Sequence, residues 1–324
     1  MTLPPVALTS GEPAGVGPEI TVKAWEALRG GHPFYWIGDA DHLPATMPIT
    51  RIDHPSEAAS VFETALPVLH VPFDAPRIPG KLQQSHAQHV IASIELAVSH
   101  SLDGLALALC TNPINKKALK DGAGFAYPGH TEFLAALGGT ETVVMMLASP
   151  ALKVVPATIH IPLADVPAAL NASGLEACIR VTHAALQNDF GLATPRIAIA
   201  GLNPHAGEGG AMGHEDQTII APVIKDLVAE GFDLHGPLPA DTMFHARARQ
   251  TYDAAICMYH DQALIPIKTL DFDRGVNVTL GLPFVRTSPD HGTALDIAGS
   301  DTANPTSLIE ALKLAVEMGS KRRI

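Results

Sequence analysis

The sequence predicts an α/β fold with largely parallel sheets. Short runs rich in Val, Ile, Leu and Ala recur along the chain with little alternation of apolar and polar residues, as expected for strands that are buried on both faces. Segments with helical periodicity lie between these runs, and the 27 prolines and 27 glycines gather in the turns. Alternating strands and helices of this kind are typical of parallel sheets covered by helices.

Five apolar runs are predicted to be buried strands, and three of them end at or near a histidine. They are Pro4 to Thr9, Gly104 to Cys110, Lys153 to His160, Arg196 to Leu202 and Ala254 to His260.

Three helices carry recognisable start or stop signals. Ser173 and Glu176 have the spacing of a capping box, and Gly191 follows the end of that periodic segment. A second box is predicted at Ser307 and Glu310, with Gly319 as its stop. The third helix is expected from Asp216 to Glu230, ended by Gly231.

The composition excludes several classes of protein. The 324 residues suffice for two domains or one large α/β unit. The net charge of −12 disfavours nucleic-acid binding, and no apolar run approaches the ~20 residues that a membrane helix needs. The three cysteines, Cys110, Cys178 and Cys257, form no CxxC pair and are expected to be buried free thiols. Together with the lack of a visible signal peptide, they predict a cytoplasmic protein.

Three histidines occupy matching positions along the chain. His160, His205 and His260 each lie at or just beyond the end of a predicted strand. In open α/β sheets these carboxyl ends border the ligand crevice. Three imidazoles gathered there would hold a divalent metal and leave a position for substrate. For any one of them alone, a hydrogen-bonded loop histidine is the simpler interpretation.

Other polar residues follow predicted strands or precede predicted helices. The glycine-rich LTSGEPAGVGPEI is either an anion-binding loop before a helix or a tight structural turn. His130 and Thr131 precede an apolar helix and are candidates for substrate binding, although Thr131 is equally suited to cap that helix. Lys268 and Arg286, with Asn277 between them, suit a phosphate or carboxylate ligand; solvated surface charge is the alternative for each cation.

Several motifs in the same order resemble one known family closely. They are GEPAGVGPE, CTNPINKKAL, YPGHTEF, ATIHIPL, GLNPHAGEGG, GPLPADTMF, YHDQALIPIK and GVNVTLGLPFVRTSPDHGTALDIAG. The sequence is similar to the PdxA family, the 4-hydroxythreonine-4-phosphate dehydrogenases of vitamin B6 (pyridoxine) biosynthesis. One departure is Glu12, where the family has Asp, and we expect only a local adjustment there.

The resemblance implies a fold similar to isocitrate and isopropylmalate dehydrogenases. We then expect two α/β/α domains around largely parallel or mixed sheets, with an active-site cleft between the domains. Domain I comprises residues 1–130 and 288–324, and domain II, with the metal ligands and the dimer interface, comprises residues 131–287. The family is homodimeric, with active sites that both subunits share.

The resemblance also assigns residues to functions. It implies that His160, His205 and His260 bind metal, with Zn²⁺ expected first and Mg²⁺ or Co²⁺ as alternatives. It implies substrate binding by His130, Thr131, Lys268, Asn277 and Arg286. The loop HGTALDIAG with the following ANP looks like a nucleotide-binding loop, so that NAD, or alternatively NADP, is expected at His291, Gly292, Thr293, Asp296 and Asn304.

The implied reaction is the NAD(P)-dependent oxidation of 4-phosphooxy-L-threonine. The product, 2-amino-3-oxo-4-phosphooxybutanoate, decarboxylates to 3-amino-1-hydroxyacetone phosphate. Lys268 and Asp241 are both candidates for the general base, and Asp241 also suits orientation of a ligand histidine or capping of its loop. Two alternatives are a related dehydrogenase of threonate or erythronate 4-phosphate and a metal-dependent hydrolase of a phosphorylated metabolite.

Overall fold

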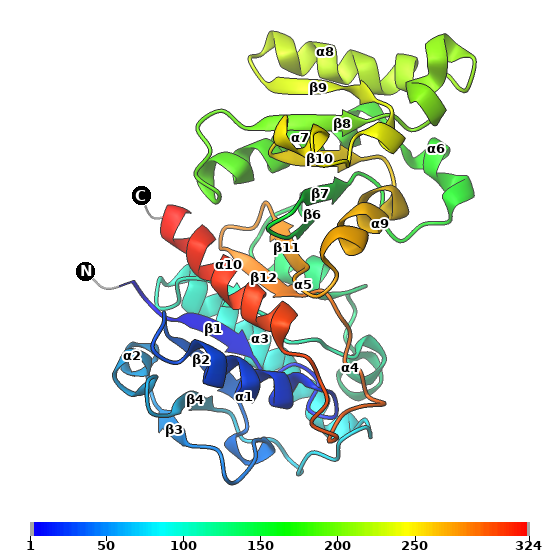
Figure 1. Ribbon diagram of the computed structural model, residues 1–324. Helices are drawn as coiled ribbons and strands as arrows, with labels where there is room; N and C mark the ends of the chain where they lie inside the picture. Colours follow the sequence, from blue (N-terminus) through cyan, green and yellow to red (C-terminus); the bar gives the residue numbers. More distant parts are fainter. Residues whose placement is uncertain (1–2, 323–324) are drawn as a thin grey trace. The chain divides into compact units, whose positions relative to one another are not determined.

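The computed structural model describes residues 3–322, and the chain divides into two compact units (Figure 1). The first unit is formed by Met1–Val143 with Leu282–Ile324, and the second by Val144–Gly281. Residues 131–143 and 282–287, which the sequence analysis assigned to domain II, therefore pack within the first unit. Within residues 3–322, no helix has the length and apolar character needed to cross a membrane.

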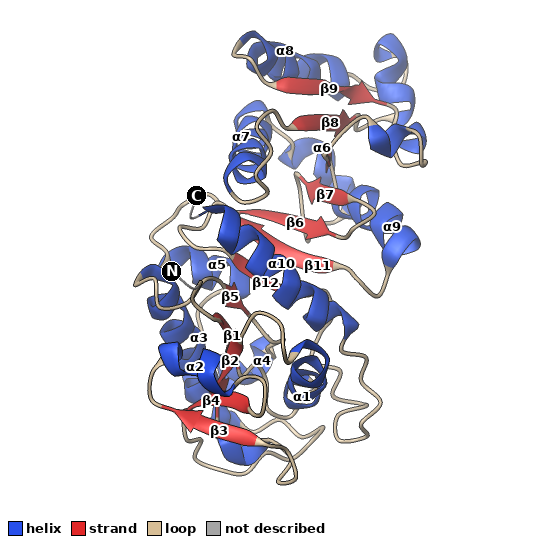
Figure 2. Cartoon of the chain, turned by 60° about the vertical axis from the view of Figure 1, so that its left-hand side comes forward, coloured by secondary structure: helices blue, strands red, loops and turns tan. Residues whose placement is uncertain are grey.

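The first unit contains a parallel sheet with strand order β3-β4-β2-β1-β5-β12. Helix α3 covers one face of this sheet, and α1 and α10 cover the other (Figure 2). The strands are β1 (Val6–Thr9), β2 (Phe34–Gly38), β3 (Ile49–Ile52), β4 (Leu66–His70), β5 (Leu109–Cys110) and β12 (Arg286–Pro289), and the helices are α1 (Gly17–Leu28), α2 (Ala58–Val61), α3 (Ala87–Leu102), α4 (Lys116–Ala123), α5 (His130–Leu137) and α10 (Thr306–Arg322).

The second unit contains a mixed sheet with strand order β11-β6-β7-β10-β8-β9. Strands β7, β10, β8 and β9 pair in parallel, whereas β6 is antiparallel to both of its neighbours β7 and β11. Helix α9 packs on one face, and α7 on the other (Figure 2). The strands are β6 (Val144–Ala148), β7 (Lys153–Pro156), β8 (Arg196–Ala200), β9 (Asp233–Leu238), β10 (Ala254–Cys257) and β11 (Val276–Leu280), and the helices are α6 (Val166–Ala169), α7 (Ala172–Asn188), α8 (Ala221–Ala229) and α9 (His260–Asp271).

Each unit has its own apolar core, which explains why the predicted strands lack alternation. In the first unit, Ala7 and Leu109 from the sheet cluster with Ile94 of α3, and all three are fully buried. In the second unit, Val154 and Ala255 from the sheet cluster with Ile267 of α9. The predicted α/β class is confirmed.

All five predicted strands are present, but they are shorter than the apolar runs. In the run from Gly104 to Cys110, the amides of Leu105 and Ala106 donate to the carbonyl of His100, so they end α3 instead of joining the sheet. Only Leu109–Cys110 remains as β5. The other four strands lose their terminal residues to turns in the same way.

Two predicted capping boxes are wrong. Helix α7 begins one residue before Ser173, because the side chain of Asn171 accepts a hydrogen bond from the Gly174 amide and acts as the cap. Helix α10 begins before Ser307, whose hydroxyl accepts a hydrogen bond from the Asp290 amide. In α7 the cap lies two residues before the predicted one, because Asn caps as well as Ser does.

Gly319 does not stop α10, which continues to Arg322. A Cβ atom at this glycine would lie 2.7 Å from Leu107 Cγ and 2.9 Å from the Leu107 carbonyl oxygen. The missing side chain therefore allows close packing of the helix.

The third predicted helix is confirmed: a wide turn over Asp216–Ile220 leads into α8, and Gly231 follows its end.

Candidate functional site

The ends of two parallel strands in the second unit bring two of the expected metal ligands together. Beyond β7 and β10, the chain keeps its pairing for two more residues: the Ala157 amide donates to the carbonyl of Cys257, and the Thr158 hydroxyl to that of Met258, at 2.7 Å each. The imidazole centroids of His160 and His260 consequently lie 5.7 Å apart. His160 has a left-handed backbone, with a φ of 51°.

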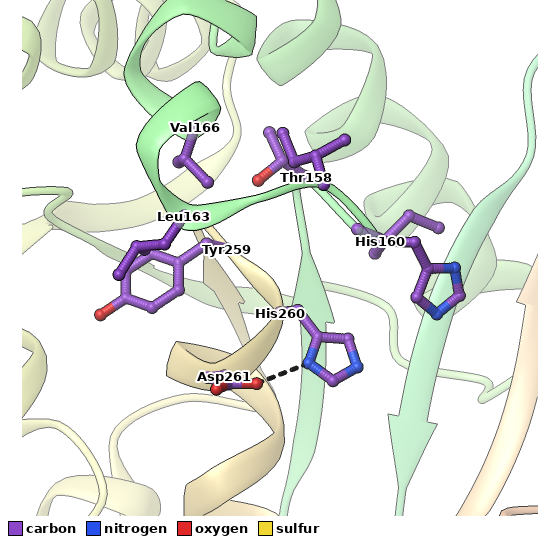
Figure 3. Close-up of a pocket in the computed structure, with 9 residues that line it drawn as sticks. Thr158, His160, Leu163, Val166, Tyr259, His260 and Asp261 are labelled. Atoms are coloured by element: carbon purple, nitrogen blue, oxygen red, sulfur yellow. Dashed lines mark hydrogen bonds and ion pairs between the residues drawn. The ribbon is translucent and has the colours of Figure 1, made fainter.

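The pair of histidines borders a pocket, shown in Figure 3. His260 is the first residue of α9, and its Nδ1 atom lies 2.7 Å from Oδ1 of Asp261. A carboxylate on Nδ1 fixes the ring and leaves Nε2 to face a ligand. The pocket is lined by Thr158, Ile159, His160, Ile161, Leu163, Val166, Tyr259, His260 and Asp261.

The third expected ligand lies in an exposed loop after β8. The side chain of His205 is 63% exposed, and its Nδ1 atom lies 3.3 Å from Oε2 of Glu208. His205 therefore shares with His260 a carboxylate partner at Nδ1, which is the arrangement found around histidines that bind metal through Nε2.

The structure brings His160 and His260 together but does not complete a three-ligand set. In the part of the chain that the structure describes, no three His, Cys, Asp or Glu side chains are grouped so that they would hold a metal ion. Imidazole donors, two of which have a carboxylate partner at Nδ1, fit a divalent transition metal. Assignment of the three histidines to one metal stays a prediction.

Three other expected residues belong to the second unit. Lys268 lies on α9, half-buried, with its Nζ atom 5.6 Å from the centroid of the Phe272 ring. Asn277 lies on β11, and its Oδ1 atom is buried without a hydrogen-bond partner. Asp241 lies in a short 3-10 turn, Ala240–Thr242, and is exposed. A buried acceptor without a partner, as in Asn277, is costly unless a ligand satisfies it.

Arg286 lies in the first unit and is one of its few buried cations. It is the first residue of β12 and is 3% exposed, so the alternative of a solvated surface charge is wrong for it. Its Nε and Nη2 atoms donate to the hydroxyl of Thr111, at 3.2 and 2.7 Å. Burial lowers the pKa of Arg286 to about 10, at which the guanidinium still carries its charge near neutral pH.

His130 and Thr131 begin helix α5 in the same unit. The Nε2 atom of His130 is buried without a hydrogen-bond partner. Burial, followed by repulsion from Arg286 and Lys116, holds the pKa of His130 well below 6.5, so the imidazole is neutral. Thr131 does not cap the helix, because Gly129 occupies the cap position and no side chain bonds there. His130 thus offers a neutral ring beside two cations.

The glycine-rich loop packs against the expected nucleotide loop. The Val16 amide donates to the carbonyl of Thr293 at 3.0 Å, and a Cβ atom at Gly15 would lie 2.6 Å from that carbonyl oxygen. Glu12 is 2% exposed and accepts a hydrogen bond from the Ala14 amide. Burial raises the pKa of Glu12, and the bond from Ala14 offsets part of this effect. The loop is therefore a tight turn that also borders the segment after Thr293.

The expected cofactor residues differ in what their side chains contact. His291 has its Nδ1 atom 2.9 Å from the Gly292 carbonyl, and its Nε2 atom is buried without a partner. Asn304 lies two residues before α10, and its Oδ1 atom accepts from the amide and hydroxyl of Thr306. Asp296 is exposed. Cofactor binding by these residues stays a prediction.

Four side chains that contact expected site residues were not singled out from the sequence. Thr111 binds Arg286, and Lys116 lies close enough to His130 to lower its pKa. Asp261 and Glu208 contact the two histidines described above. The last two are one and three residues from their histidines, a spacing that a search for carboxylate partners would have found.

Comparison with known proteins finds similarity over almost the whole chain. The family described as "Pyridoxal phosphate biosynthetic protein PdxA" matches residues 31–315. Proteins named 4-hydroxythreonine-4-phosphate dehydrogenase from Roseobacter denitrificans and a Ruegeria species are 63% and 61% identical over 318 residues, each comparison covering 98% of both chains. A crystal structure of the enzyme of that name from Klebsiella pneumoniae has a TM-score of 0.88 and 39% identity, and covers 98% of each chain.

Proposed function

Because the chain belongs to the PdxA family, we propose that it is a 4-hydroxythreonine-4-phosphate dehydrogenase of vitamin B6 biosynthesis. The structural observation that best supports the proposal is the pair of His160 and His260, whose rings lie 5.7 Å apart at the ends of parallel strands. A buried arginine and an unsatisfied Asn277 acceptor, both at expected substrate positions, support it further.

The proposed reaction oxidises the secondary hydroxyl of 4-phosphooxy-L-threonine. The hydroxyl proton passes to a base and the hydride from the same carbon passes to NAD, with NADP as the alternative. The product, 2-amino-3-oxo-4-phosphooxybutanoate, has a carbonyl β to its carboxylate and loses carbon dioxide to give 3-amino-1-hydroxyacetone phosphate. The protein must therefore bind two anionic groups, favour loss of a proton and exclude water.

His160, His205 and His260 would hold the metal, for which Zn²⁺ is proposed first and Mg²⁺ or Co²⁺ as alternatives. A divalent ion at that position supplies Lewis acidity toward an oxygen of the substrate. The chain's own contribution is orientation: Asp261 and Glu208 fix the rings of His260 and His205 through Nδ1.

Lys268 is the proposed general base, and Asp241 is the alternative. Lys268 lies on the helix that begins with His260 and is half-buried, whereas Asp241 is exposed in a turn. Lys268 is favoured because it lies on the same helix as His260, a proposed metal ligand, and a base must lie close to the hydroxyl proton that it removes. A general base acts only in its deprotonated form, so Lys268→Met should remove the acidic limb from the pH profile of kcat, whereas Asp241→Asn should leave the profile's shape intact.

The substrate's anionic groups are proposed to bind the residues that the resemblance to the family implies. Arg286 supplies a permanent positive charge, and neutral His130 supplies a hydrogen-bonding nitrogen beside it. Thr131, Lys268 and Asn277 complete the proposed set. Substitutions in either unit are then expected to raise KM for the phosphorylated substrate.

Cofactor, assembly and location complete the proposal. The segment His291–Asn304 is proposed to bind the nicotinamide cofactor, supported by its packing against the glycine-rich loop at Thr293.

A homodimer in which metal ligands come from both subunits is proposed, because a single chain does not group three ligands among residues 3–322. A cytoplasmic location is supported by the three buried free cysteines.

One assay tests the proposal against its rivals. The purified protein is incubated with Zn²⁺ or Mg²⁺, NAD or NADP, and each candidate substrate, and reduced cofactor is followed by absorbance. Reduction with 4-phosphooxy-L-threonine is the expected result. Reduction only with threonate or erythronate 4-phosphate would replace the substrate, and phosphate release without NAD would replace the reaction by hydrolysis.

A further inference from the structure

The loop that presents His205 has an unusual backbone. Five consecutive residues, His205 to Gly209, have positive φ values of 54°, 53°, 80°, 41° and 68°. Three of the five, His205, Ala206 and Glu208, are not glycine and therefore strain the chain in this conformation. Such a backbone persists only when surrounding contacts hold it in place.

One buried carboxylate holds the residues that lead into this segment. Asp216 is 1% exposed, and its Oδ1 atom accepts a hydrogen bond from the Leu202 amide at 2.8 Å. Its Oδ2 atom accepts from the amide and the side-chain nitrogen of Asn203, at 3.1 and 3.0 Å. Asp216 thereby fixes the two residues that lead from β8 into the strained segment.

Two glycines leave room for this carboxylate. A Cβ atom at Gly201 would lie 2.7 Å from Oδ1 of Asp216, and one at Gly207 would lie 3.2 Å from Oδ2. Gly207 belongs to the strained segment itself, with a φ of 80°. The loop thus wraps around the carboxylate both before and after His205.

The same loop is tied to the turn that carries His260. The side chain of Gln262 accepts a hydrogen bond from the Met258 amide at 2.7 Å and donates to the Gly201 carbonyl at 2.8 Å. The start of the His205 loop and the start of α9 are therefore held in one hydrogen-bonded arrangement. A movement of the loop at Gly201 would be transmitted to the start of α9, where His260 lies, through the hydrogen bonds of Gln262.

We propose that Asp216 is a positioning residue that holds the His205 loop in the conformation needed for metal binding. The inference rests on the proposed function, since it assumes that His205 is a metal ligand. The hydrogen bonds of Asp216 are made to Leu202 and Asn203, so Asp216 acts through the backbone that leads to His205. Glu208 then sets the ring of His205 through Nδ1.

The test measures zinc affinity by competition with a chromophoric chelator, in the absence of substrate and NAD. Asp216→Asn keeps the size of the side chain but turns an NH₂ donor toward amide donors. It should weaken zinc binding about ten- to hundred-fold, the usual effect of removing an outer-shell partner. The matched control is Asp226→Asn, on the exposed surface of α8, which should bind zinc as the unaltered protein does.

A second variant guards against misfolding of the first. Gly207→Ala adds a Cβ atom 3.2 Å from Oδ2 of Asp216 and strains the backbone, and should weaken zinc binding in the same direction. Hydrogen exchange of the Leu202 and Asn203 amides should be faster in Asp216→Asn without metal, while melting shows that the protein remains folded.

A double-substitution cycle separates positioning from a general structural role. In a His205→Ala background, Asp216→Asn should cause no further loss of zinc affinity, because the residue that it positions is gone. An equal loss in both backgrounds, or unchanged affinity in Asp216→Asn alone, would overturn the inference and leave the proposed function intact. Absence of zinc binding by the unaltered protein would overturn the proposed metal site and the inference with it.

Discussion

The expected substrate residues of the first unit and the expected metal ligands of the second unit differ in how they are held. Arg286 is 3% exposed and anchored by the Thr111 hydroxyl, and the ring nitrogen of His130 is buried. The side chains of His205 and His260, by contrast, are 63% and 39% exposed. Charge is desolvated in one unit, and the expected metal ligands are partly exposed in the other.

The difference indicates two ways of preparing a binding site. A buried cation strengthens every interaction with an anion because the local dielectric is low. The exposed histidines avoid the desolvation cost of a buried site. Asp261 and Glu208 hold their rings through Nδ1, so their Nε2 atoms stay available for a ligand. The proposed dimer would supply the burial that these histidines lack within one chain.

Loss of a proposed metal ligand should have the largest effect. His260→Ala is expected to weaken zinc binding on the order of a thousand-fold, since each ligand contributes several kcal/mol to a zinc site. The exposed ring makes few packing contacts, so the melting temperature without metal should change little. Zinc content after dialysis and melting with and without chelator measure the two effects.

The control for this substitution is His245→Ala, an exposed histidine in the same unit that is not an expected ligand. Full zinc retention by His260→Ala would contradict the difference drawn between the two units, because His260 would then not be a metal ligand.

Removal of the buried cation should have the next largest effect. Arg286→Ala is expected to lower kcat/KM about a hundred- to a thousand-fold, the usual result of deleting one partner of a buried charge pair. Saturation kinetics with 4-phosphooxy-L-threonine should place most of the loss in KM. Arg51→Ala, which removes an exposed arginine paired with Asp41, should leave kcat/KM unchanged.

Removal of the Thr111 hydroxyl, which accepts hydrogen bonds from Arg286, should have a smaller and more specific effect on KM. Thr111→Val removes the hydroxyl that accepts from Nε and Nη2 but keeps the shape of the side chain. KM is expected to rise about ten- to hundred-fold, because hydrogen bonds to a charged group are the strong ones. Thr111→Ser restores the hydroxyl and should recover most of the affinity; equal KM for Val and Ser would contradict a positioning role.

Much of this arrangement could be predicted from the sequence. The apolar runs marked the strands, and strand ends marked His160 and His260 as neighbours, because parallel strands end at the same edge of a sheet. The capping boxes misled, since local Ser and Glu spacing says nothing about whether an Asn two residues earlier takes the cap.

Other features depend on contacts between distant residues and had no local signal. Arg286 and Thr111 are 175 positions apart in sequence, and their hydrogen bond exists only because β5 and β12 are adjacent in the sheet. Burial of Arg286 likewise follows from packing, not from its polar neighbours. The left-handed backbone at His205 and Ala206 could not be predicted for a different reason, because residues other than glycine adopt this conformation only uncommonly.

The smallest predicted effect concerns pH and the stability of the first unit. The pKa of His130 is well below 6.5 in the folded chain, because of burial and then the charges of Arg286 and Lys116. The unfolded chain therefore takes up a proton first as the pH falls, and the folded state loses stability as the pH falls below about 6.5, the pKa of an unperturbed histidine. His130→Gln removes this titration, so its free energy of unfolding should decline less over that range, as measured by urea denaturation at each pH. Identical slopes for the unaltered protein and His130→Gln would mean that burial and the neighbouring cations do not hold the ring neutral. The contrast between a desolvated first unit and an exposed second unit would then rest on Arg286 alone.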